Sequence, residues 1–316
     1  MQEGVSIIIC CYNSEKRIRE TLRHLAAQQQ LSFPAEILLI DNACTDRTVS
    51  AAQDCWQELG SPVPLHIHRE ERPGLTHARM CGIGAARYSI TLFCDDDNHL
   101  DPLYLCTAYH FMQSHPEVGA CFGHSEAIYE ETPPSWIHGL EEAFAVGPAD
   151  LAEGEIEPPR TPWGAGLLMP TAFLKKMQAG EQGSYLSDRT GKSLSSGGDT
   201  EFCYRARAEG YRWYYNPALR FRHVIPAGRT GKTYLRSLFA KFGEAEARID
   251  RYYRERPGRP VNFNISRYIL KERFLLKAAA LLPQSDASFH RELDRIRKLG
   301  YYSEWLKISG NERTAH

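Results

Sequence analysis

Three consecutive carboxylates, Asp95, Asp96 and Asp97, end an apolar run in the stretch "FCDDDN". Neighbouring like charges repel one another, so each must be hydrated or paired with a cation. Hard divalent cations prefer oxygen ligands, and Mg²⁺ usually takes one or two carboxylates together with substrate phosphates. The residues alone leave two interpretations equally open. One is a metal site, and the other is a solvated acidic turn that caps the next helix, although Asp101-Pro102 already supplies that cap.

A second candidate lies about a hundred residues downstream, in "SGGDTEFCYRARAEGY". Asp199 falls at the expected start of a helix, where the helix dipole keeps a carboxylate ionised. A purely structural role, as an N-cap beside a Glu201–Arg205 pair, is favoured for this aspartate alone. Gly197 and Gly198 weaken that interpretation, because two glycines let the backbone approach a ligand closely.

The sequence predicts a sheet that would position these side chains. "VSIIICCYN" (residues 5–13) is a continuous apolar run, as expected for a strand buried on both faces. The same scheme recurs, with strands expected at 35–41, 65–70 and 89–94 and helices at 17–27, 46–59 and 74–86. This alternation predicts an α/β fold with a mostly parallel central sheet flanked by helices. Ligands bind beyond the carboxyl ends of such strands, where Tyr12, Asp41 and Asp95–Asp97 fall.

Composition narrows the class of protein further. The 316 residues carry a net charge of −1, which gives no global field for nucleic acid, and we expect no nucleic-acid partner. The nine cysteines include no CxxC pair, which fits reduced thiols in the cytoplasm better than disulfides. No apolar run approaches the ~20 residues of a membrane span. The N-terminus also resembles no targeting peptide, so we expect a cytoplasmic protein.

The chain changes character after its middle. Residues 130–163 are rich in Pro, Gly and Glu and predict a long loop or lid. A short strand and a helix are expected in 163–177, a helix at about 199–209 and a strand at 211–215. From about residue 232 onward, three amphipathic, basic and aromatic helical segments follow. We therefore predict a catalytic domain over residues 1–228 and a helical extension over 229–316.

The helical extension has two possible partners. Its aromatic and basic residues could lie on a membrane surface, at the inner face of the cell membrane, and bring the protein to a lipid-linked acceptor. They could instead pack on the first domain or on a second subunit of a homodimer. The second interpretation is favoured, because Glu and Asp interrupt every basic run.

Five stretches together resemble one family: "VSIIICCYNSEKRIRETLRHLAAQ", "EILLIDNACTDRT", "RPGLTHARMCGI", "FCDDDNHLDP" and "GGDTEFCYR". Their order and spacing over residues 4–225 are similar to those of family 2 glycosyltransferases. That family has the Rossmann-like GT-A fold and consists of inverting enzymes that use nucleotide sugars. A single such stretch would be a weak signal, whereas five in the same order are a strong one.

The resemblance implies roles on the donor side. Tyr12 would stack on or flank the nucleotide base, and Asp41 would hydrogen-bond to the base edge. Arg79 would approach the diphosphate or the ribose. Asp95 and Asp96 would contact the ribose or organise the loop.

The resemblance also implies the catalytic machinery. Asp97 would bind Mn²⁺ or Mg²⁺, and His223 falls where some members place a further metal ligand, although a lone His after a strand is more often simply packed. The metal would neutralise the leaving diphosphate. Asp199 would take the proton from an acceptor hydroxyl as its oxygen attacks the anomeric carbon, which inverts the configuration.

The sequence departs from the family at informative positions. Gly198 stands where many members have an acidic residue that positions the acceptor, which puts acceptor handling in doubt. Cys10 and Cys11 replace the common Pro-Thr beneath the nucleotide base, which is expected to change packing rather than chemistry. Trp163 and Gly164 begin a segment that falls on the acceptor side of the family's site.

The expected function is therefore inverting sugar transfer to a glycan or lipid-linked acceptor in cell-surface polysaccharide synthesis, with a uridine diphosphate sugar favoured as donor. The alternative is a catalytically silent module that binds a nucleotide sugar or a metal, which only Gly198 favours. A nucleotidyltransferase of the same fold would need a basic, Gly-rich phosphate loop after the first strand, and "CCYNSEKRIRE" is not such a loop.

Overall fold

The computed structural model describes residues 1–180, 197–253, 264–279 and 284–313. The chain divides into two compact units. The first consists of the described residues of Met1–Ile128, Glu141–Gly183 and Phe202–Val224. The second consists of those of Tyr129–Leu140, Ser184–Glu201 and Ile225–His316. The expected boundary between residues 228 and 229 stays a prediction.

Four parallel strands form one half of the sheet in the first unit, in the order β3-β2-β1-β4. They are β1 (Gln2–Cys11), β2 (Ala35–Asn42), β3 (Leu65–Glu70) and β4 (Tyr88–Phe93). Ile7 of β1 lies opposite Ile37 of β2, and both are fully buried. The continuous apolar runs therefore form the parallel α/β core that the sequence predicts.

Helices cover both faces of this half. They are α1 (Ile18–Ala26), α2 (Thr48–Glu58), α3 (Leu75–Ala85), α4 (Tyr104–Ser114) and α5 (Thr171–Ala179). Ile7 and Ile9 belong to the core that includes Leu22 of α1. Ile8 points the other way, against Gly82 of α3, where a Cβ would find no room. The period-2 alternation of the strand thus directs Ile7 and Ile9 to one face of the sheet and Ile8 to the other.

The other half of the sheet is antiparallel, and the sequence predicted it only in part. Beyond β4 the order continues β8-β6-β9-β5, and β7 pairs with β9. The strands are β5 (Asn98–Leu100), β6 (Val118–Tyr129), β7 (Gly154–Ile156), β8 (Leu167–Pro170) and β9 (Arg212–Ile225). β9 is far longer than the expected strand at 211–215, because it continues through Asn216-Pro217, a pair that normally marks a turn.

Residues 130–163, expected as a loop, contain short elements. Two 3₁₀ helices, η1 (Ser135–Ile137) and η2 (Glu141–Phe144), precede β7. An isolated bridge joins Ser125 to Gly147. Most of the segment is nonetheless irregular, as its Pro and Gly content predicts.

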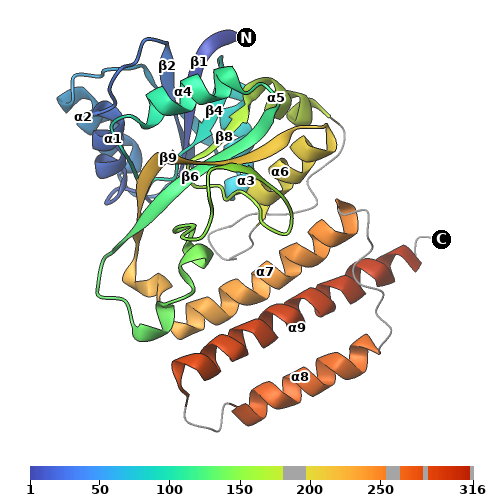
Figure 1. The fold of residues 1–316 in the computed structure, drawn as a ribbon. Helices are drawn as coiled ribbons and strands as arrows, with labels where there is room; N and C mark the ends of the chain where they lie inside the picture. The colour runs from blue at the N-terminus through green and yellow to red at the C-terminus, as the bar shows by residue number, and fades with distance from the viewer. Residues whose placement is uncertain (181–196, 254–263, 280–283, 314–316) are drawn as a thin grey trace. The chain divides into compact units, whose positions relative to one another are not determined.

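The second unit contains three long helices, as the sequence predicts: α7 (Lys232–Tyr252), α8 (Ile265–Ala279) and α9 (Asp286–Arg313), after a short 3₁₀ helix η3 (Ala227–Arg229). α9 lies between α7 and α8 (Figure 1). α7 and α9 are parallel, because Arg236 pairs with Glu292 and, further along both helices, Arg248 pairs with Glu304. Within the described residues, no helix combines the length and apolar character that a membrane span requires.

The parallel pair packs closely at two glycines. A Cβ at Gly243 of α7 would collide with the Arg297 carbonyl of α9, and one at Gly300 of α9 would collide with the Ala240 carbonyl of α7. Small residues at these crossings therefore let the two backbones approach each other.

Candidate active site

The aspartates lie in a tight turn at the carboxyl edge of the sheet. β4 ends at Phe93, and Asp95–Asn98 form what we call the acid turn. The Asn98 N–H donates to the Asp95 carbonyl oxygen at 3.1 Å, and the Asp95 N–H donates to Asn98 Oδ1 at 3.0 Å. This double hydrogen bond fixes the backbone that carries the three carboxylates.

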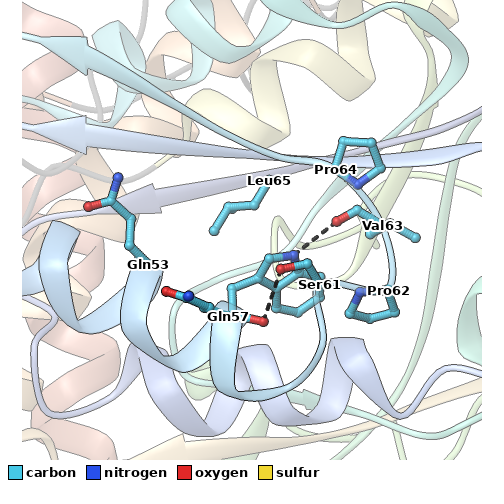
Figure 2. A pocket seen from close by; sticks show the side chains of 8 residues that line it. Gln53, Gln57, Ser61, Pro62, Val63, Pro64 and Leu65 are labelled. Carbon is cyan, nitrogen blue, oxygen red and sulfur yellow. Dashed lines mark hydrogen bonds between the residues drawn. The ribbon is translucent and has the colours of Figure 1, made fainter.

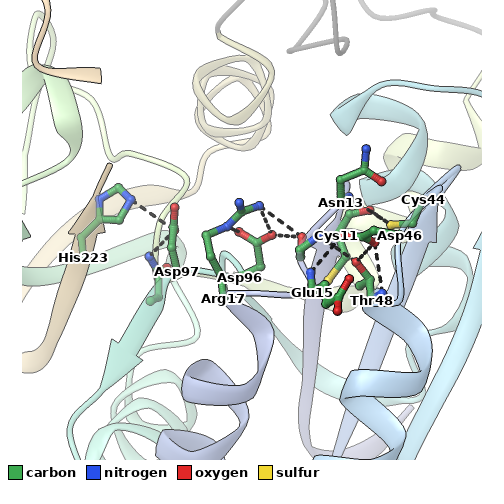
Figure 3. Close-up of polar contacts among 12 residues, drawn as sticks. Cys11, Asn13, Glu15, Arg17, Cys44, Asp46, Thr48, Asp96, Asp97 and His223 are labelled. Atoms are coloured by element: carbon green, nitrogen blue, oxygen red, sulfur yellow. Dashed lines mark hydrogen bonds and ion pairs between the residues drawn. The ribbon is translucent and has the colours of Figure 1, made fainter. Parts of the chain in front are cut away.

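Strand pairing brings His223 to the acid turn from 126 positions away in the chain. β5 starts at Asn98 and runs antiparallel to β9, with Asn98 opposite His223. The Val224 N–H donates to the Asp97 carbonyl oxygen at 3.0 Å. As a result, His223 Nε2 lies 3.3 Å from Asp97 Oδ1 (Figure 3).

The contact of the other ring nitrogen of His223 fixes the tautomer and the orientation of the ring. Nδ1 lies 2.7 Å from the Phe144 carbonyl oxygen, which can only accept, so Nδ1 carries a proton. Nε2 is thereby directed at Asp97, and both side chains are buried, 7% and 3% exposed. Metal-binding histidines typically donate their second N–H to a carbonyl or carboxylate in this way. Donor atoms of Asp95, Asp97 and His223 all lie within 4.8 Å of one another, so the three side chains could hold one cation.

The electrostatics of the acid turn disfavour its own negative charge. Burial, together with the neighbouring Asp97 carboxylate, raises the pKa of Asp95. The nearby Arg79 guanidinium and His223 oppose that rise without cancelling it. A cation bound between the carboxylates would supply the missing positive charge.

Asp96 has a different environment from its two neighbours. Its carboxylate accepts from Arg17 Nη2 at 2.8 Å and from Nε at 3.3 Å, and it also accepts from the Ser14 hydroxyl. Burial and Asp97 still raise the pKa of Asp96, against the effect of Arg17. Asp96 therefore ties the acid turn to the loop between β1 and α1 and lies outside the group that could hold a cation (Figure 3).

Two loops form the edge where the sequence expects the nucleotide base. The loop after β1 and the loop after β2 are joined by the Asn13 side chain, whose Oδ1 accepts from the Thr45 N–H at 2.8 Å. Asn13 and Ala43 both have positive φ, 52° and 55°. Tyr12 projects from this edge and is 47% exposed, so its ring face is accessible to a planar ligand.

Asp41 is the last residue but one of β2, and its carboxylate already accepts two hydrogen bonds. Its Oδ2 accepts from Arg69 Nη1 at 2.6 Å, and its Oδ1 accepts from the Cys44 N–H at 2.9 Å. Burial raises the pKa of Asp41, but the hydrogen bonds from Arg69 and Cys44 outweigh burial and hold the pKa below its usual value. Asp41 is consequently an anion of fixed orientation.

Two further residues that the sequence places on the donor side are buried or half-buried. Arg79 in α3 is 5% exposed, and its guanidinium lies over the Phe93 ring, 5.7 Å from the centroid. Cys10 is half-buried in β1, opposite Ile40 of β2. The donor-side roles of Arg79 and Cys10 stay predictions.

The segment that the sequence places on the acceptor side begins with a constrained tryptophan. The Trp163 ring meets Phe122 edge to face, with centroids 4.9 Å apart. Its indole N–H is buried and finds no hydrogen-bond acceptor among the described residues. Gly164 is buried, and its carbonyl accepts from the Leu167 N–H at 3.4 Å, which leads the chain into β8.

Asp199 lies where the sequence expects it, in the first turn of α6 (Gly198–Ala208). Gly197, immediately before that helix, has φ +121°, a conformation that favours glycine. Gly198 is buried at the helix start. The Asp199 carboxylate accepts from the Thr200 N–H, and Glu201 accepts from the Tyr253 hydroxyl at 2.5 Å. The role of Asp199 as a base stays a prediction.

A surface hollow of about 390 Å³ lies elsewhere, between α2 and the start of β3 (Figure 2). It is lined by Gln53, Trp56, Gln57 and residues 61–65. The hollow is at the amino end of β3, the opposite edge of the parallel strands from the acid turn. Its lining contains no titratable side chain, so it offers no acid–base or metal chemistry.

Several residues of the site could not be recognised in the sequence. They are Ser14, Arg17, Arg69 and Asn98. Arg17 lies 79 positions from Asp96, and Arg69 lies 28 positions from Asp41. Each of these two arginines is one cation among the chain's 38 Lys and Arg residues, so no local pattern marks it.

Comparison with known proteins identifies the family. The model of Glycosyl transferase family 2 matches residues 6–164, half of the chain, and that of Glycosyl transferase family group 2 matches residues 90–254. A Mycobacterium tuberculosis protein, Rv1520, is 34% identical over 148 residues, which cover 43% of this chain and 41% of that protein. Poly-beta-1,6-N-acetyl-D-glucosamine synthase of Staphylococcus epidermidis is 25% identical over 150 residues, 46% of this chain and 34% of the synthase. The matches thus span less than half of these relatives.

Solved structures show the same fold. Residues 1–349 of Staphylococcus aureus TarS, in complex with UDP-GlcNAc, align with a TM-score of 0.53 and 17% identity over 97% of this chain and 92% of that one. Mannosyltransferase PcManGT from Pyrobaculum calidifontis, in complex with GDP-Man and Mn²⁺, aligns with a TM-score of 0.62 and 17% identity over 97% and 88% of the two chains. These likenesses show a GT-A fold. With the family match over half of its length, the chain belongs to glycosyl transferase family 2.

Proposed function

We propose that this chain is an inverting, metal-dependent glycosyltransferase that acts at the cytoplasmic side of the cell membrane. It transfers a sugar from a nucleotide-diphosphate sugar to a hydroxyl of a glycan or lipid-linked acceptor during cell-surface polysaccharide synthesis. The observation that carries the proposal is the group of Asp95, Asp97 and His223 at the carboxyl edge of the sheet. Its setting within a family 2 chain supports sugar transfer as the chemistry.

Asp97 and His223 are the proposed metal ligands, and Asp95 adds negative charge beside them. Two carboxylates and one imidazole with an oriented Nε2 suit Mn²⁺ or Mg²⁺ completed by phosphate oxygens. A bound ion would act as a Lewis acid toward the leaving diphosphate. The Mn²⁺ in the PcManGT structure supports this assignment.

The nucleotide is proposed to lie across the loops after β1 and β2, with Cys10 of β1 beneath these loops. The exposed ring of Tyr12 would stack on the nucleobase. Asp41, held as an anion by Arg69, would accept an N–H from the base edge. Uridine fits this acceptor because its ring N–H is a donor, and the TarS complex with UDP-GlcNAc supports the choice. Arg79 supplies positive charge for the diphosphate or the ribose.

On the acceptor side we propose Asp199 as the general base. A carboxylate in the first turn of a helix stays ionised, so it can take the proton from the acceptor hydroxyl. Attack opposite the leaving diphosphate inverts the anomeric configuration. Trp163, Gly164 and Gly198 are proposed to shape the space for the acceptor, and Gly198 leaves room where a side chain would otherwise stand.

The first test is a thermal-shift panel with UDP, GDP, dTDP and CMP, each with and without Mn²⁺. We expect UDP to raise the melting temperature only when Mn²⁺ is present, because a ligand stabilises the state that binds it. The same panel on Asp97→Asn should lose the Mn²⁺-dependent shift. Absence of a shift with every nucleotide would contradict the proposed donor site.

The second test separates an enzyme from a silent binding module. Asp199→Asn should lower turnover of the sugar nucleotide by about 10²- to 10⁴-fold, the usual contribution of a general base. It should leave the UDP–Mn²⁺ thermal shift in place. A wild-type chain that binds UDP and Mn²⁺ but shows no Asp199-dependent turnover would favour the silent module.

A further inference from the structure

The outer face of α8 exposes apolar side chains to solvent. Its two large apolar side chains, Leu270 and Phe274, are 66% and 71% exposed. They are the most exposed large hydrophobic side chains in the described part of the chain. Because residues three and four positions apart share a helix face, Leu270 and Phe274 form one apolar ridge.

Cations surround that ridge. Four exposed basic side chains belong to α8: Arg267, Lys271, Arg273 and Lys277. Within the described residues, none of the four is paired with a carboxylate. Arg267 precedes Leu270 by three positions, and Lys271 precedes Phe274 by three, so both cations share the face of the ridge. The surface therefore combines apolar side chains with unneutralised positive charge.

The one acid of α8 points away from this face. Glu272 is 7% exposed, and its Oε2 accepts from Arg295 Nη1 of α9 at 2.7 Å. Ile269 is also buried, and Tyr268 meets Tyr302 of α9 edge to face, with centroids 5.0 Å apart. In the sequence, Glu272 interrupts the basic run and argues against a membrane contact. In the structure Glu272 belongs to the packed side, so the charged side chains on the exposed side of α8 are all cations.

We infer that the outer face of α8 binds the surface of an anionic lipid bilayer. Leu270 and Phe274 would enter the boundary between headgroups and acyl chains, and the four cations would contact anionic headgroups. Charge complementarity selects this occupant, because a second copy of the same face would bring like charges together. The inference does not depend on the transfer reaction.

Co-sedimentation of the full chain with vesicles tests this inference. Phosphatidylcholine vesicles with and without phosphatidylglycerol are the probe, at low and at high salt. We expect binding only to vesicles that contain phosphatidylglycerol, and weaker binding at high salt, because salt screens exposed charges. Equal binding to neutral vesicles, or no binding to either, would overturn the inference.

Matched variants locate the surface. Arg267→Gln combined with Lys271→Gln should weaken binding about 30-fold, since each cation near an anionic surface contributes roughly a factor of five. Leu270→Ser combined with Phe274→Ser should weaken binding while leaving its salt dependence. Arg291→Gln, an exposed cation on α9, is the control that should bind as the wild type does.

Two further measurements distinguish lipid binding from misfolding and from self-association. Circular dichroism and thermal melting should show unchanged folding, because the substituted side chains are exposed. Light scattering measures the oligomeric state. If the apolar double variant dissociates a dimer while vesicle binding is unaffected, the face is an interface between copies of the chain and the lipid inference is wrong.

Discussion

The pKa values of carboxylates in the acid turn and in the second unit are shifted in opposite directions. Glu292 accepts from Arg236, and this hydrogen bond, against burial, lowers its pKa. Glu304 is buried, but hydrogen bonds from Arg248 and Lys307 still lower its pKa. In the acid turn, burial and Asp97 raise the pKa of Asp95. The second unit stabilises its own negative charge, and the acid turn does not.

This difference distinguishes carboxylates with a structural role from carboxylates that could bind a cation. A carboxylate whose pKa is lowered by a neighbouring arginine has its compensating charge within the chain. A carboxylate whose pKa is raised by other carboxylates lacks a compensating charge of comparable strength. A bound cation would therefore stabilise the carboxylates most at such a position. Asp96 lies between these cases, because Arg17 is its partner and Asp97 is its neighbour.

The largest expected effect tests the site directly. Asp97→Asn should reduce metal-dependent sugar transfer by at least about a hundredfold, because a metal supplies several kcal/mol of charge stabilisation in such reactions. Release of UDP from the sugar nucleotide, measured over a range of Mn²⁺ concentrations, checks this. Asp54→Asn, an exposed carboxylate in α2, is the control. Wild-type activity in Asp97→Asn would remove the acid turn from the proposed mechanism.

A smaller effect is expected when an arginine partner is removed from the second unit. Arg248→Met leaves the Glu304 carboxylate, 6% exposed, with Lys307 at 3.2 Å as its one remaining ion-pair partner among the described residues. We expect a loss of about 2 kcal/mol in the free energy of unfolding, less than for a fully buried pair because the Arg248 side chain is 35% exposed. Urea denaturation measures it. Arg291→Met, at an exposed position with no ion pair to another described residue, should change the free energy of unfolding by less than about 0.5 kcal/mol.

The pH dependence of stability should carry the same signature. The pKa of Glu292 lies below its ordinary value of 4.5 in the folded chain, so the Arg236 pair stabilises above pH 4.5 and is lost as the pH falls further. Glu292→Gln should therefore be less stable than the wild type near neutral pH, by about 1 kcal/mol or less. The difference in melting temperature should close at acidic pH. A difference independent of pH would show that packing, and not charge, is responsible.

The smallest expected effect has the opposite sign. Without added metal, Asp97→Asn should leave the free energy of unfolding unchanged or raise it slightly, within about 0.5 kcal/mol, because it removes a charge from a repulsive cluster. Urea denaturation of the metal-free protein measures this. A large loss of stability would mean that Asp97 is a structural acid like Glu304.

The sequence predicts the parallel half of the fold well and the antiparallel half poorly. The strands at 5–11 and 35–41 are mostly apolar and are largely buried on both faces, so the sequence already indicates them. β9 contains Asn216-Pro217, which locally indicates a turn, and only its neighbours in the sheet keep it extended. β5 has three residues, too few for any periodicity.

The site shows the same limit. The sequence cannot distinguish the three adjacent aspartates from one another. In the structure, the ion pair with Arg17 distinguishes Asp96 from the other two. His223 reaches Asp97 through the β5–β9 pairing, which no short-range pattern predicts. The direction of Glu272 is likewise fixed by Arg295 on another helix. Local chemistry predicts which residues are candidates, and tertiary pairing decides their roles.

The order of the three long helices has a consequence for how the second unit forms. α9 leaves the ribosome after α7 and α8, yet it is the helix that both others pack against. Until α9 is made, the small-residue crossing at Gly243 and the Glu272 carboxylate lack their α9 partners. The three helices therefore cannot assemble before synthesis has passed α9. Until then, the faces of α7 and α8 that contact α9 in the folded chain must be exposed to solvent or to chaperones.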